Sequence, residues 1–546
     1  MPTSHNTIRE SIRLEYYDKQ VLIRQALQRS ISKIHFSVDA WTSPNQIGIL
    51  GIVVHFVIDK LGLQHLLIAM QEIDGSHTGE AFQMETIALY EDYDILDKMG
   101  YMMADNAGNN DTMGTWIDQE LEDRGINWTH AKYRVRCIGH IINLFVQAFL
   151  RGLSKDFDFK SIEINTLDKD KFRDLAEVKR WRKLGPLGKL RNLVVYVMAS
   201  PQRRQIWKEY SGGKLLKKHN ATRWNSVYDM IGRGLELRSP LDRYMIDYKD
   251  DLPDTLTLND WVFLINVYEF LEKFYEATKG TEGDDETLAG VLFTMDFLVR
   301  HYRANISEHS KSSQIGKCLE AGYKRLDNYY ELTDHSPAYA AAIVLDPTWK
   351  WGHFEDAWVD KPVWIQKAKN MVQKLWMDDN KDIITTMSLT STDIVYEPPA
   401  KRLKGSFNDY RNRPRPQPKP AEKTIEDEYE RYLSQPLVPV PNEGFNALQW
   451  WLDPLRKVEF PSLRRMAIDV LSIPAMAASN ERVFSHSKDT MSDKRCSMDA
   501  DLLEWLECLR SWNNSSILSK VSTNPITVTC TPLTIYRTLK LRISSK

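Results

Sequence analysis

Residues 34–73 read IHFSVDAWTSPNQIGILGIVVHFVIDKLGLQHLLIAMQEI, and this stretch decides the fold of the chain. Apolar and polar side chains alternate over its first six residues, which is the period of a β-strand, and the turn-forming sequence TSPN follows at 42–45. Two more β-rich runs, at 49–59 and 63–73, are joined by the short link KLG. Strands with such tight connections pair with their neighbours, so we predict a three-stranded antiparallel meander.

The segments on either side of the meander complete an α/β order. A leading helix is expected within 1–33. After the meander we expect, in order, a helix at 79–93, a strand at 101–105, a helix at 112–124, a strand at 133–137 and a helix that ends near 150. The order β-β-β-α-β-α-β-α is that of a ribonuclease-H-like fold, a mixed sheet with helices on its faces. We predict this α/β domain over 34–154.

The rest of the chain divides by composition. Residues 155–377 have helical periodicity and many aromatic side chains, which indicates an all-α domain with an aromatic core. Residues 378–443 include the prolines of EPP and RPRPQPKP, and proline runs block helices, so we expect a disordered linker there. Helical spacing returns in 444–513, where we expect four helices, and the tail, 514–546, has no clear period.

The overall composition is that of an ordinary globular protein. The chain has 546 residues, 42 % of them hydrophobic, and its 72 Lys and Arg nearly balance its 74 Asp and Glu. No apolar run approaches the roughly 20 residues that span a bilayer, and no leader peptide opens the chain. We therefore expect an intracellular protein without a membrane partner. The five cysteines are scattered without a CxxC spacing, which supports neither a disulfide framework nor a structural zinc site: Cys137, Cys318, Cys496, Cys508 and Cys530.

One segment is strongly basic despite the small net charge. Residues 179–223 hold thirteen Lys or Arg and a single acid, Glu209, so this segment carries a charge of +12 and the rest of the chain −14. Like charges gathered in this way repel each other, and they favour a polyanionic partner such as a nucleic acid. Trp181, Trp207 and Trp224 lie among them and offer faces on which unpaired bases stack. The alternative is a solvated basic face on a helical domain.

Two carboxylates stand at the ends of predicted strands, Asp39 after the first strand and Asp105 after the fourth. In a ribonuclease-H-like sheet these two strands are neighbours, so the two side chains should meet. Close carboxylates repel each other unless a cation lies between them, and their hard oxygen atoms suit Mg²⁺ or Mn²⁺. The alternative for each aspartate alone is a turn cap.

Five short motifs occur in an order that resembles the hAT (hobo/Activator-like) DNA transposases, especially fungal restless-like elements. They are DAWTS at 39–43, DNAGNN at 105–110, RCIGHIINL at 136–144, RWNS at 223–226 and SNERVFS at 479–485. The resemblance implies a ribonuclease-H-like fold that is interrupted by a large all-α insertion and followed by a helical dimerisation region. Full-length members usually carry an N-terminal BED-type zinc finger, and no such spacing of Cys and His precedes the first predicted strand.

The resemblance also implies an active site. Asp39, Asp105 and Glu481 match the catalytic and metal-binding D-D-E triad, whose two Mg²⁺ or Mn²⁺ ions stabilise the attacking and leaving oxygens of a phosphodiester displacement. Water attacks first and a DNA 3′-hydroxyl attacks next. Taken alone, Glu481 would be an exposed helix glutamate beside Arg482.

The same resemblance implies residues that contact DNA. Arg223 and Trp224 match the family's arginine–tryptophan pair, in which the ring stacks on a base that is flipped out beside the cleavage site. Lys217 and Lys218 in the basic segment, and His140, are expected to contact DNA as well. The alternative for Trp224 is a buried helix anchor.

Cys137 and His140 match the CxxH element of the family. Two such ligands without a second pair do not complete the tetrahedral coordination of zinc, so no structural zinc is expected. We predict a structural or active-site-proximal role for both residues.

Two functions follow from these patterns. The first is a Mg²⁺-dependent transposase core that cleaves DNA and transfers strands, acts on transposon ends and target DNA, and assembles as a dimer or higher oligomer. The alternative is an inactive or domesticated nuclear protein that binds DNA and dimerises through 450–512. A weaker third is a helical scaffold in which the acids are accidental. PPAKRLK at 398–404 resembles a short nuclear-import signal, so a nuclear location is expected.

Overall fold

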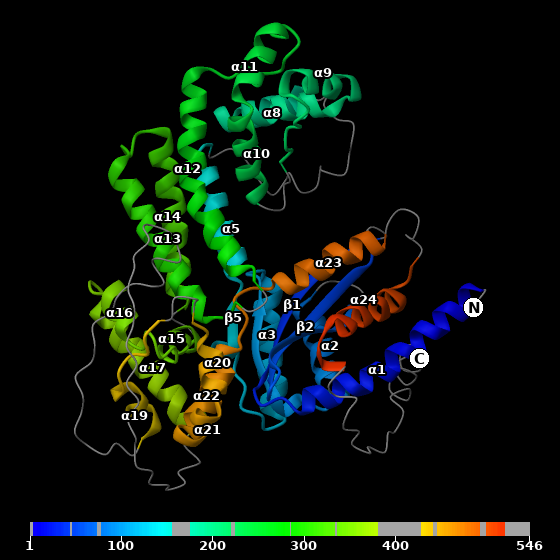
Figure 1. Cartoon of the computed structure of the whole chain (residues 1–546), viewed down its shortest axis with the longest axis vertical. Helices are drawn as coiled ribbons and strands as arrows, with labels where there is room; N and C mark the ends of the chain where they lie inside the picture. Colours follow the sequence, from blue (N-terminus) through cyan, green and yellow to red (C-terminus); the bar gives the residue numbers. More distant parts are fainter. Residues whose placement is uncertain are drawn as a thin grey trace.

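The chain is described here by a computed structural model in which three groups of elements are seen, a sheet with its covering helices, a long helical body and a C-terminal group of helices (Figure 1). The structure describes residues 4–43, 46–73, 78–154, 175–219, 224–283, 286–333, 336–380, 427–440, 445–491 and 498–518. Within these ranges, none of the helices has both the length and the apolar character needed to cross a membrane.

The five strands of the sheet lie in the order β3-β2-β1-β4-β5. The first three form the predicted antiparallel meander: β1 Ile34–Thr42, β2 Gly48–Ile58 and β3 Gly62–Glu72. Beside β1 lie two parallel strands: β4 Met99–Ala104 and β5 Arg134–Arg136. The strand β2 is buried along most of its length, which explains its nearly continuous apolar run. The order and directions of the strands match the predicted ribonuclease-H-like sheet.

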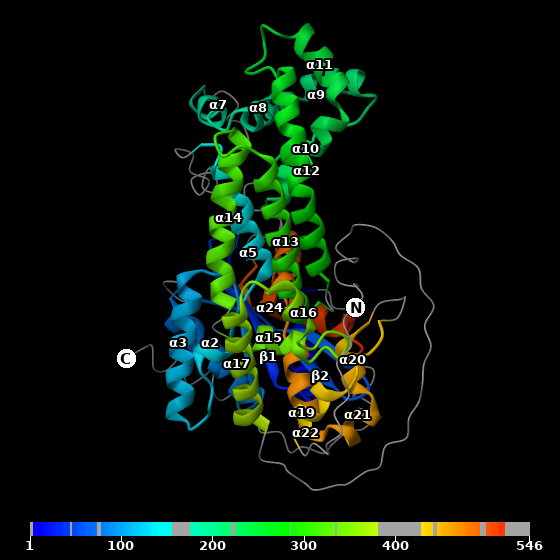
Figure 2. The same ribbon diagram turned by 90° about the vertical axis from the view of Figure 1, so that its left-hand side faces the viewer.

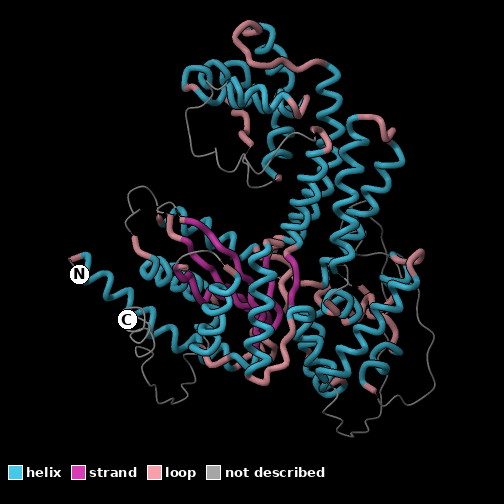
Figure 3. Tube along the Cα trace, turned by 180° about the vertical axis from the view of Figure 1, so that it is seen from behind, coloured by secondary structure: helices cyan, strands magenta, loops and turns pink. Residues whose placement is uncertain are grey.

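Helices surround the sheet, as Figure 3 shows from behind. The helices of the first domain, with the short 3₁₀ turn η1, are α1 His5–Gln28, α2 Gly79–Asp92, η1 Leu96–Lys98, α3 Gly108–Asp123, α4 His130–Tyr133 and α5 Ile138–Arg151. They correspond to the helices expected from the sequence, with the addition of η1 and α4. The start of α3 at Gly108, before the expected residue 112, brings its amino end next to Asp105.

Every element described between α5 and residue 380 is a helix, as predicted for 155–377. These helices are α7 Leu175–Arg182, α8 Pro186–Ala199, α9 Pro201–Ser211, α10 Asn225–Glu236, α11 Arg238–Asp247, α12 Leu258–Thr281, α13 Ala289–Glu308, α14 Gln314–Thr333, α15 Ala338–Val344, α16 Gly352–Ala357 and α17 Pro362–Asn380. Figures 1 and 2 show α12 running from the distal helices α8–α11 down to the sheet, beside α5 and α13.

The C-terminal group contains one helix more than the four expected. Its members, with the preceding α19, are α19 Glu428–Ser434, α20 Ala447–Leu452, α21 Pro454–Glu459, α22 Pro461–Leu471, α23 Ala478–Thr490 and α24 Ala500–Asn514. The sequence pattern missed α21, which is short and has no buried residue. Pro454 and Pro461 stand in the first turns of α21 and α22, where a missing N–H costs nothing.

The prediction that 378–443 lacks order is wrong for part of this range. The helix α19 lies inside it, and its Tyr432 is completely buried, with its hydroxyl donating to the carbonyl of Val344 at 3.0 Å. Burial of this aromatic side chain offsets the entropy lost on ordering the helix. The proline-rich part of the predicted linker and the import-like motif at 398–404 lie outside the described residues.

The edge strand β3 is covered by a helix from the other end of the sequence. The indole N–H of Trp512 on α24 donates to the carbonyl of Leu67 at 2.8 Å, and the Leu67 N–H donates to Ser511 Oγ at 3.0 Å. Tyr16 of α1 stacks on Trp512 with ring centroids 5.0 Å apart. Satisfying the free backbone groups of an edge strand blocks pairing with other chains, so the two ends of the described chain complete the sheet together.

Candidate active site

The three acids singled out from the sequence come from three separate elements. Asp39 lies on β1, where its Cα is paired with that of Gly51 on β2, and Asp105 directly follows β4. Because β1 and β4 are parallel neighbours, the two aspartates stand at the same end of the sheet, as predicted. Glu481 is in the first turn of α23, which packs against β1 and β2.

Asp39 lies further inside its strand than the sequence suggested. The prediction placed it at the strand end, but β1 continues to Thr42, which pairs with Gly48, and the Ser43 N–H still donates to the carbonyl of Ile47 at 2.9 Å. The turn between β1 and β2 is therefore tighter than expected. As a consequence, Asp39 is flanked by strand backbone and is partly buried.

This position gives Asp39 an unusual ionisation behaviour. Burial, and then the nearby charges of Asp105 and Glu481, together raise the pKa of its carboxyl group from 3.8 to about 7. One hydrogen bond, from the Ala40 N–H at 2.9 Å, opposes this rise without cancelling it. The charges of Asp105 and Glu481 therefore both act on Asp39, although Glu481 lies 376 positions after Asp105 in the sequence.

Asp105 is oriented by the turn that leads into α3. Its Oδ1 accepts hydrogen bonds from the Ala107 N–H at 2.9 Å and from Asn110 Nδ2 at 2.7 Å. Its Oδ2 lies 3.9 Å from Nδ1 of His140 on α5. Sequence reasoning quoted Asn110 within the motif but gave it no role. The bond from the Ala107 N–H is the turn that an Asp makes to the backbone two residues later.

Two arginines that sequence reasoning did not select support the same turn. Arg134 on β5 is buried and donates to the backbone carbonyls of Ala104 and Asp105. Arg136 donates to Oδ1 of Asn106 at 2.7 Å. Burial lowers the pKa of Arg134 to about 10, so its side chain stays protonated at neutral pH. The charged residues in the short strand RVR were the available signal for this role.

The CxxH residues lie beside the acids. Cys137 caps α5, its thiol is buried, and its Sγ accepts a hydrogen bond from the Ala477 N–H at 3.5 Å, just before α23. Burial raises the pKa of the Cys137 thiol to about 11, which keeps it neutral. Burial also lowers the pKa of His140, against the opposing effect of Asp105. Both residues are thus close to the acid site, and Cys137 connects α5 to the segment that carries Glu481.

A close approach fixes the middle of α23 on the sheet. The ring of Phe484 stacks on Trp41 with centroids 5.8 Å apart. A Cβ atom at Gly51 would lie only 2.8 Å from Phe484, so glycine is needed at this position for the helix to reach the strand. The SNERVFS and DAWTS motifs therefore meet in space through the aromatic side chains of Phe484 and Trp41.

The acids have the donor chemistry of a divalent cation site. Across the described residues, no three His, Cys, Asp or Glu side chains are already gathered closely enough to hold a metal ion. Burial and the charges of Asp105 and Glu481 nevertheless raise the pKa of Asp39 and so disfavour its ionised form. Carboxylate oxygens in this condition suit Mg²⁺ or Mn²⁺, so the residues present fit such an ion chemically.

The residues expected to contact DNA, apart from His140, lie away from the acids. Lys217 and Lys218 precede α10 among the distal helices, and Lys217 pairs with Asp229 at 3.3 Å. Arg223 lies outside the described residues. Trp224 is buried and packs edge-to-face on Phe274 at 6.5 Å. In this arrangement Trp224 is a helix anchor, the alternative role, and a base could stack on it only if the ring left this contact.

The basic segment also has fewer unpaired cations than its sequence suggests. Several of its cations pair with acids that precede or follow it in the chain: Arg182 with Asp254, Lys189 with Asp260, Arg191 with Glu177, Lys214 with Glu236 and Lys217 with Asp229. Trp181 and Trp207 are buried as well. The charge that this surface presents to solvent is therefore smaller than the +12 counted along the sequence.

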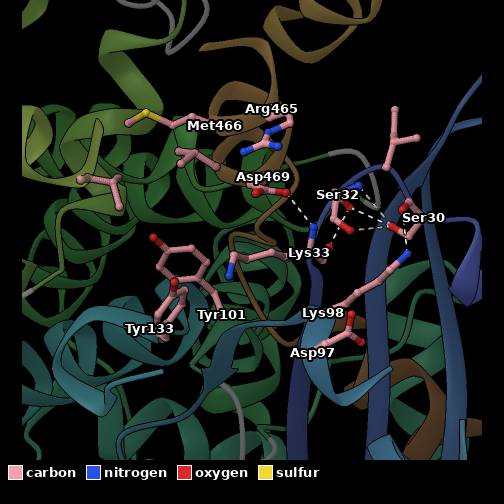
Figure 4. A pocket seen from close by; sticks show the side chains of 13 residues that line it. Ser30, Ser32, Lys33, Asp97, Lys98, Tyr101, Tyr133, Arg465, Met466 and Asp469 are labelled. Carbon is pink, nitrogen blue, oxygen red and sulfur yellow. Dashed lines mark hydrogen bonds between the residues drawn. The ribbon is translucent and has the colours of Figure 1, made fainter. Parts of the chain in front are cut away.

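A cavity of about 340 Å³ lies apart from the acids (Figure 4). Lys33, just before β1, and Lys98, just before β4, line it, so it stands at the amino ends of strands whose other ends carry Asp39 and Asp105. Asp469 of α22 accepts the Lys33 N–H at 2.6 Å at its wall. Acidic and basic side chains are mixed around this cavity, and it is not part of the acid site.

Comparisons with known proteins agree with this division of the chain. Residues 37–132 match the ZBED1 RNase-like domain, and residues 428–513 match the hAT family C-terminal dimerisation region. The chain is 24 % identical to the putative transcriptional regulator tpeD of Talaromyces stipitatus, over 90 % of this chain and 55 % of that protein. It is 23 % identical to the putative AC transposase of Zea mays, over 93 % of this chain and 60 % of that protein.

A third relative has a similar degree of likeness. The zinc finger BED domain-containing protein RICESLEEPER 2 of Oryza sativa subsp. japonica is 19 % identical, over 91 % of this chain and 67 % of that protein. The chain thus spans less than two thirds of the length of the first two relatives. The first matched region contains Asp39 and Asp105, and the second contains Glu481. The two matched regions, and the AC transposases among the relatives, show that the chain is similar to the hAT family of transposases.

Proposed function

We propose that this chain is the core of a DNA transposase that cleaves phosphodiester bonds with Mg²⁺ or Mn²⁺ held by Asp39, Asp105 and Glu481. The observation that carries the proposal is the placement of Asp39 and Asp105 at the same end of neighbouring parallel strands, with Glu481 on a helix that packs against β1. Burial, and then the charges of Asp105 and Glu481, raise the pKa of Asp39 to about 7. A protein gains nothing in stability from bringing like charges together in this way, so a bound cation is the simplest reason for the arrangement.

The residues of the chain supply the positions at which chemistry occurs. Divalent ions at this site would polarise a phosphodiester and activate the attacking oxygen. Asn110 and the Ala107 N–H hold Oδ1 of Asp105, which leaves its Oδ2 directed toward His140. His140, with its lowered pKa, is neutral at pH 7. Its ring can donate a hydrogen bond to a DNA phosphate, or accept one from a sugar hydroxyl, beside the acids.

DNA binding is assigned to the distal helices on the basis of their exposed cations. Lys179 on α7, Lys208 on α9 and Lys218 before α10 are exposed to solvent. Phosphate contacts of this kind position a duplex without reading its sequence and weaken as salt rises. Recognition of particular transposon ends is not explained by these contacts.

Self-association and a nuclear location complete the proposal. The match of 428–513 to a dimerisation region supports contact between copies of this chain. Within that region, Leu455 and Val458 lie one turn apart on α21 and are 68 % and 64 % exposed, whereas the larger apolar residues of α20 and α22 are mostly buried. Replacing both with aspartate should lower the mass measured by light scattering, and an unchanged mass would place the contact elsewhere. The nuclear location is supported by relatives that are a putative transcriptional regulator and a putative transposase.

The cleavage proposal is tested with the purified chain, supercoiled plasmid and either Mg²⁺ or Mn²⁺. We expect metal-dependent nicking that Glu481→Gln abolishes. Glu122→Gln, which alters an exposed acid on α3, is the matched control and should nick at the normal rate. Nicking by Glu481→Gln at the normal rate would contradict the assignment of that residue.

A second function is favoured by one comparison. The relative tpeD is described as a putative transcriptional regulator, so this chain is alternatively a nuclear DNA-binding protein without cleavage activity. In that case the same experiment gives salt-sensitive retention of DNA, and no metal produces nicks. The two functions are therefore distinguished by one set of reactions.

A further inference from the structure

The residue before Glu481 ties α23 to the sheet. Asn480 is 1 % exposed, and its Nδ2 donates to the carbonyls of Gly51 at 2.9 Å and Ser37 at 3.2 Å. Its Oδ1 accepts a hydrogen bond from Ser37 Oγ at 2.6 Å. Both N–H groups and the carbonyl of this buried amide are therefore used, which fixes its orientation.

The hydrogen bonds of Asn480 reach the backbone of two residues near Asp39, one on the same strand and one on the neighbouring strand. Ser37 lies two residues before Asp39 and points to the same face of β1, while Gly51 is the cross-strand partner of Asp39. The single Ser37 hydroxyl hydrogen is donated to Asn480, so His55 Nε2, 3.1 Å away, donates to Ser37. Burial lowers the pKa of His55 well below its ordinary value, which is consistent with a neutral ring. These hydrogen bonds together hold α23 to β1 and β2.

The residue after Glu481 reaches a different part of the protein. Nη1 of Arg482 donates to the carbonyl of Glu282 at 3.2 Å, at the carboxyl end of the long helix α12. Exposed carbonyls at this end of a helix attract a cation, so the contact has a favourable electrostatic component. Figure 1 shows that α12 descends to the level of α23 at this point.

Backbone contacts strengthen the connection to the helical body. Between α12 and α13, Thr287 forms an antiparallel bridge with Pro474, five residues before the SNERVFS motif. The Leu288 N–H donates to the carbonyl of Ile473 at 2.8 Å, and the Ala475 N–H donates to the carbonyl of Glu286 at 3.2 Å. The segment that leads into Glu481 is thus held by the α12–α13 connection as well as by the sheet.

We propose that Asn480 and Arg482 are positioning residues that set the Glu481 carboxylate against Asp39 from two sides, the sheet and the helical body. Neither residue touches the reacting atoms. Asn480 fixes the distance of α23 from β1 and β2, and Arg482 fixes its direction relative to α12. The inference rests on the proposed metal-dependent function, and it adds that the third acid is in place only when the helical body is docked on the sheet.

The chain offers matched controls on the same helix. Ser487 is buried and donates to Val483, so Ser487→Ala removes a buried polar group without approaching Glu481. Lys488 is exposed, so Lys488→Ala removes a cation from α23 as Arg482→Ala does. Ser37→Ala weakens the sheet tie from the other side and leaves α23 unchanged.

The experiment measures Mn²⁺ binding to the full chain by calorimetry and plasmid nicking as a function of Mn²⁺ concentration. We expect Asn480→Ala and Arg482→Ala each to raise the Mn²⁺ dissociation constant at least tenfold, Ser37→Ala to raise it less, and Arg482→Lys to recover part of the loss. High Mn²⁺ should restore most of the nicking rate in these variants, because the carboxylate is still present. It should not restore Glu481→Gln.

The outcomes separate this inference from the function on which it rests. If Glu481→Gln loses Mn²⁺ while Asn480→Ala and Arg482→Ala bind it as tightly as the controls, the positioning role is wrong and the metal site stands. If Glu481→Gln binds Mn²⁺ normally, the proposed site and the positioning role both fail. Should Asn480→Ala not fold, Arg482→Ala decides the matter, because that side chain is exposed and its loss leaves the core intact.

Discussion

The acid site and the distal basic helices treat concentrated charge in opposite ways. At the acid site, Asp39 is partly buried near the charges of Asp105 and Glu481, and these effects raise its pKa to about 7. Among the distal helices, acids from outside the basic segment, such as Asp254 and Asp260, pair with its cations. The acid site brings like charges near one another, although the acids are scattered along the sequence. The distal helices neutralise part of a positive charge that is conspicuous in the sequence.

This difference shows that the clustering of charged residues along the sequence and the clustering of their charges in the folded structure are separate properties. A basic run predicts a binding surface only after the acids that fold onto it have been subtracted. Uncompensated charge that persists in the folded state, as at Asp39, is the stronger indication of a missing partner. The acid site is therefore the better supported part of the proposed function.

The largest expected effect comes from removing charge at the acid site. Asp39→Asn keeps the shape of the side chain and removes a metal-binding oxygen, and several kcal/mol of transition-state stabilisation correspond to a rate loss of about 10³-fold or more. The nicking rate on supercoiled plasmid measures this. A variant within tenfold of the original rate would mean that Asp39 is not a metal ligand.

The next largest effect distinguishes the two roles considered for Trp224. Because the ring is buried against Phe274, Trp224→Ala should destabilise the fold by about 3–5 kcal/mol, as expected for truncation of a large core side chain. Chemical denaturation measures the loss. A variant of normal stability with weakened DNA binding would instead support base stacking by this ring.

A smaller effect concerns stability at the acid site and depends on pH. The folded-state pKa of Asp39 is raised, so its ionised form destabilises the fold, and this cost grows from about pH 4 to pH 7 and is complete above that. Asp39→Asn should therefore raise the melting temperature at pH 8, by the equivalent of about 1–3 kcal/mol, and leave it nearly unchanged at pH 4. Equal shifts at both pH values would show that the carboxylate is not destabilising in the folded state.

The smallest effect tests the compensation of charge in the distal helices. Glu236 pairs with Lys214 at 2.7 Å and with Arg233 at 2.9 Å. Glu236→Gln should raise the affinity for duplex DNA about twofold at low salt, since one more cation becomes available to phosphate. Fluorescence anisotropy over a series of salt concentrations measures it. Glu122→Gln makes the same change in net charge far from these helices, and an equal gain in that variant would remove the local explanation.

The sheet and two of its acids could be predicted because their signals are local. Alternation of apolar residues and short links determine the meander, and strand neighbours bring Asp39 and Asp105 together. The exact depth of Asp39 within β1 could not be predicted, because it depends on how tightly the hairpin closes beyond Thr42. Glu481 was selected through its motif, since periodicity alone gives an exposed helix residue.

The contacts that position Glu481 could not be predicted, because they join residues far apart in sequence. Ser37 and Asn480 are 443 positions apart, and nothing in the sequence around either residue indicates that they form a hydrogen bond with each other. The same holds for the pairing of Lys189 with Asp260, which depends on the packing of α8 against α12. The helix α19 was missed for a related reason, since its order comes from the burial of Tyr432 in a pocket made by distant helices.

The most direct test of the central claim is a Mn²⁺ titration of the full chain followed by electron paramagnetic resonance, which distinguishes free from bound ion. The acid site predicts a bound signal in the original chain and in Glu122→Gln, and its loss in Asp39→Asn and in Glu481→Gln. Equal amounts of bound Mn²⁺ in all four proteins would contradict the claim that the three separated acids form one cation site.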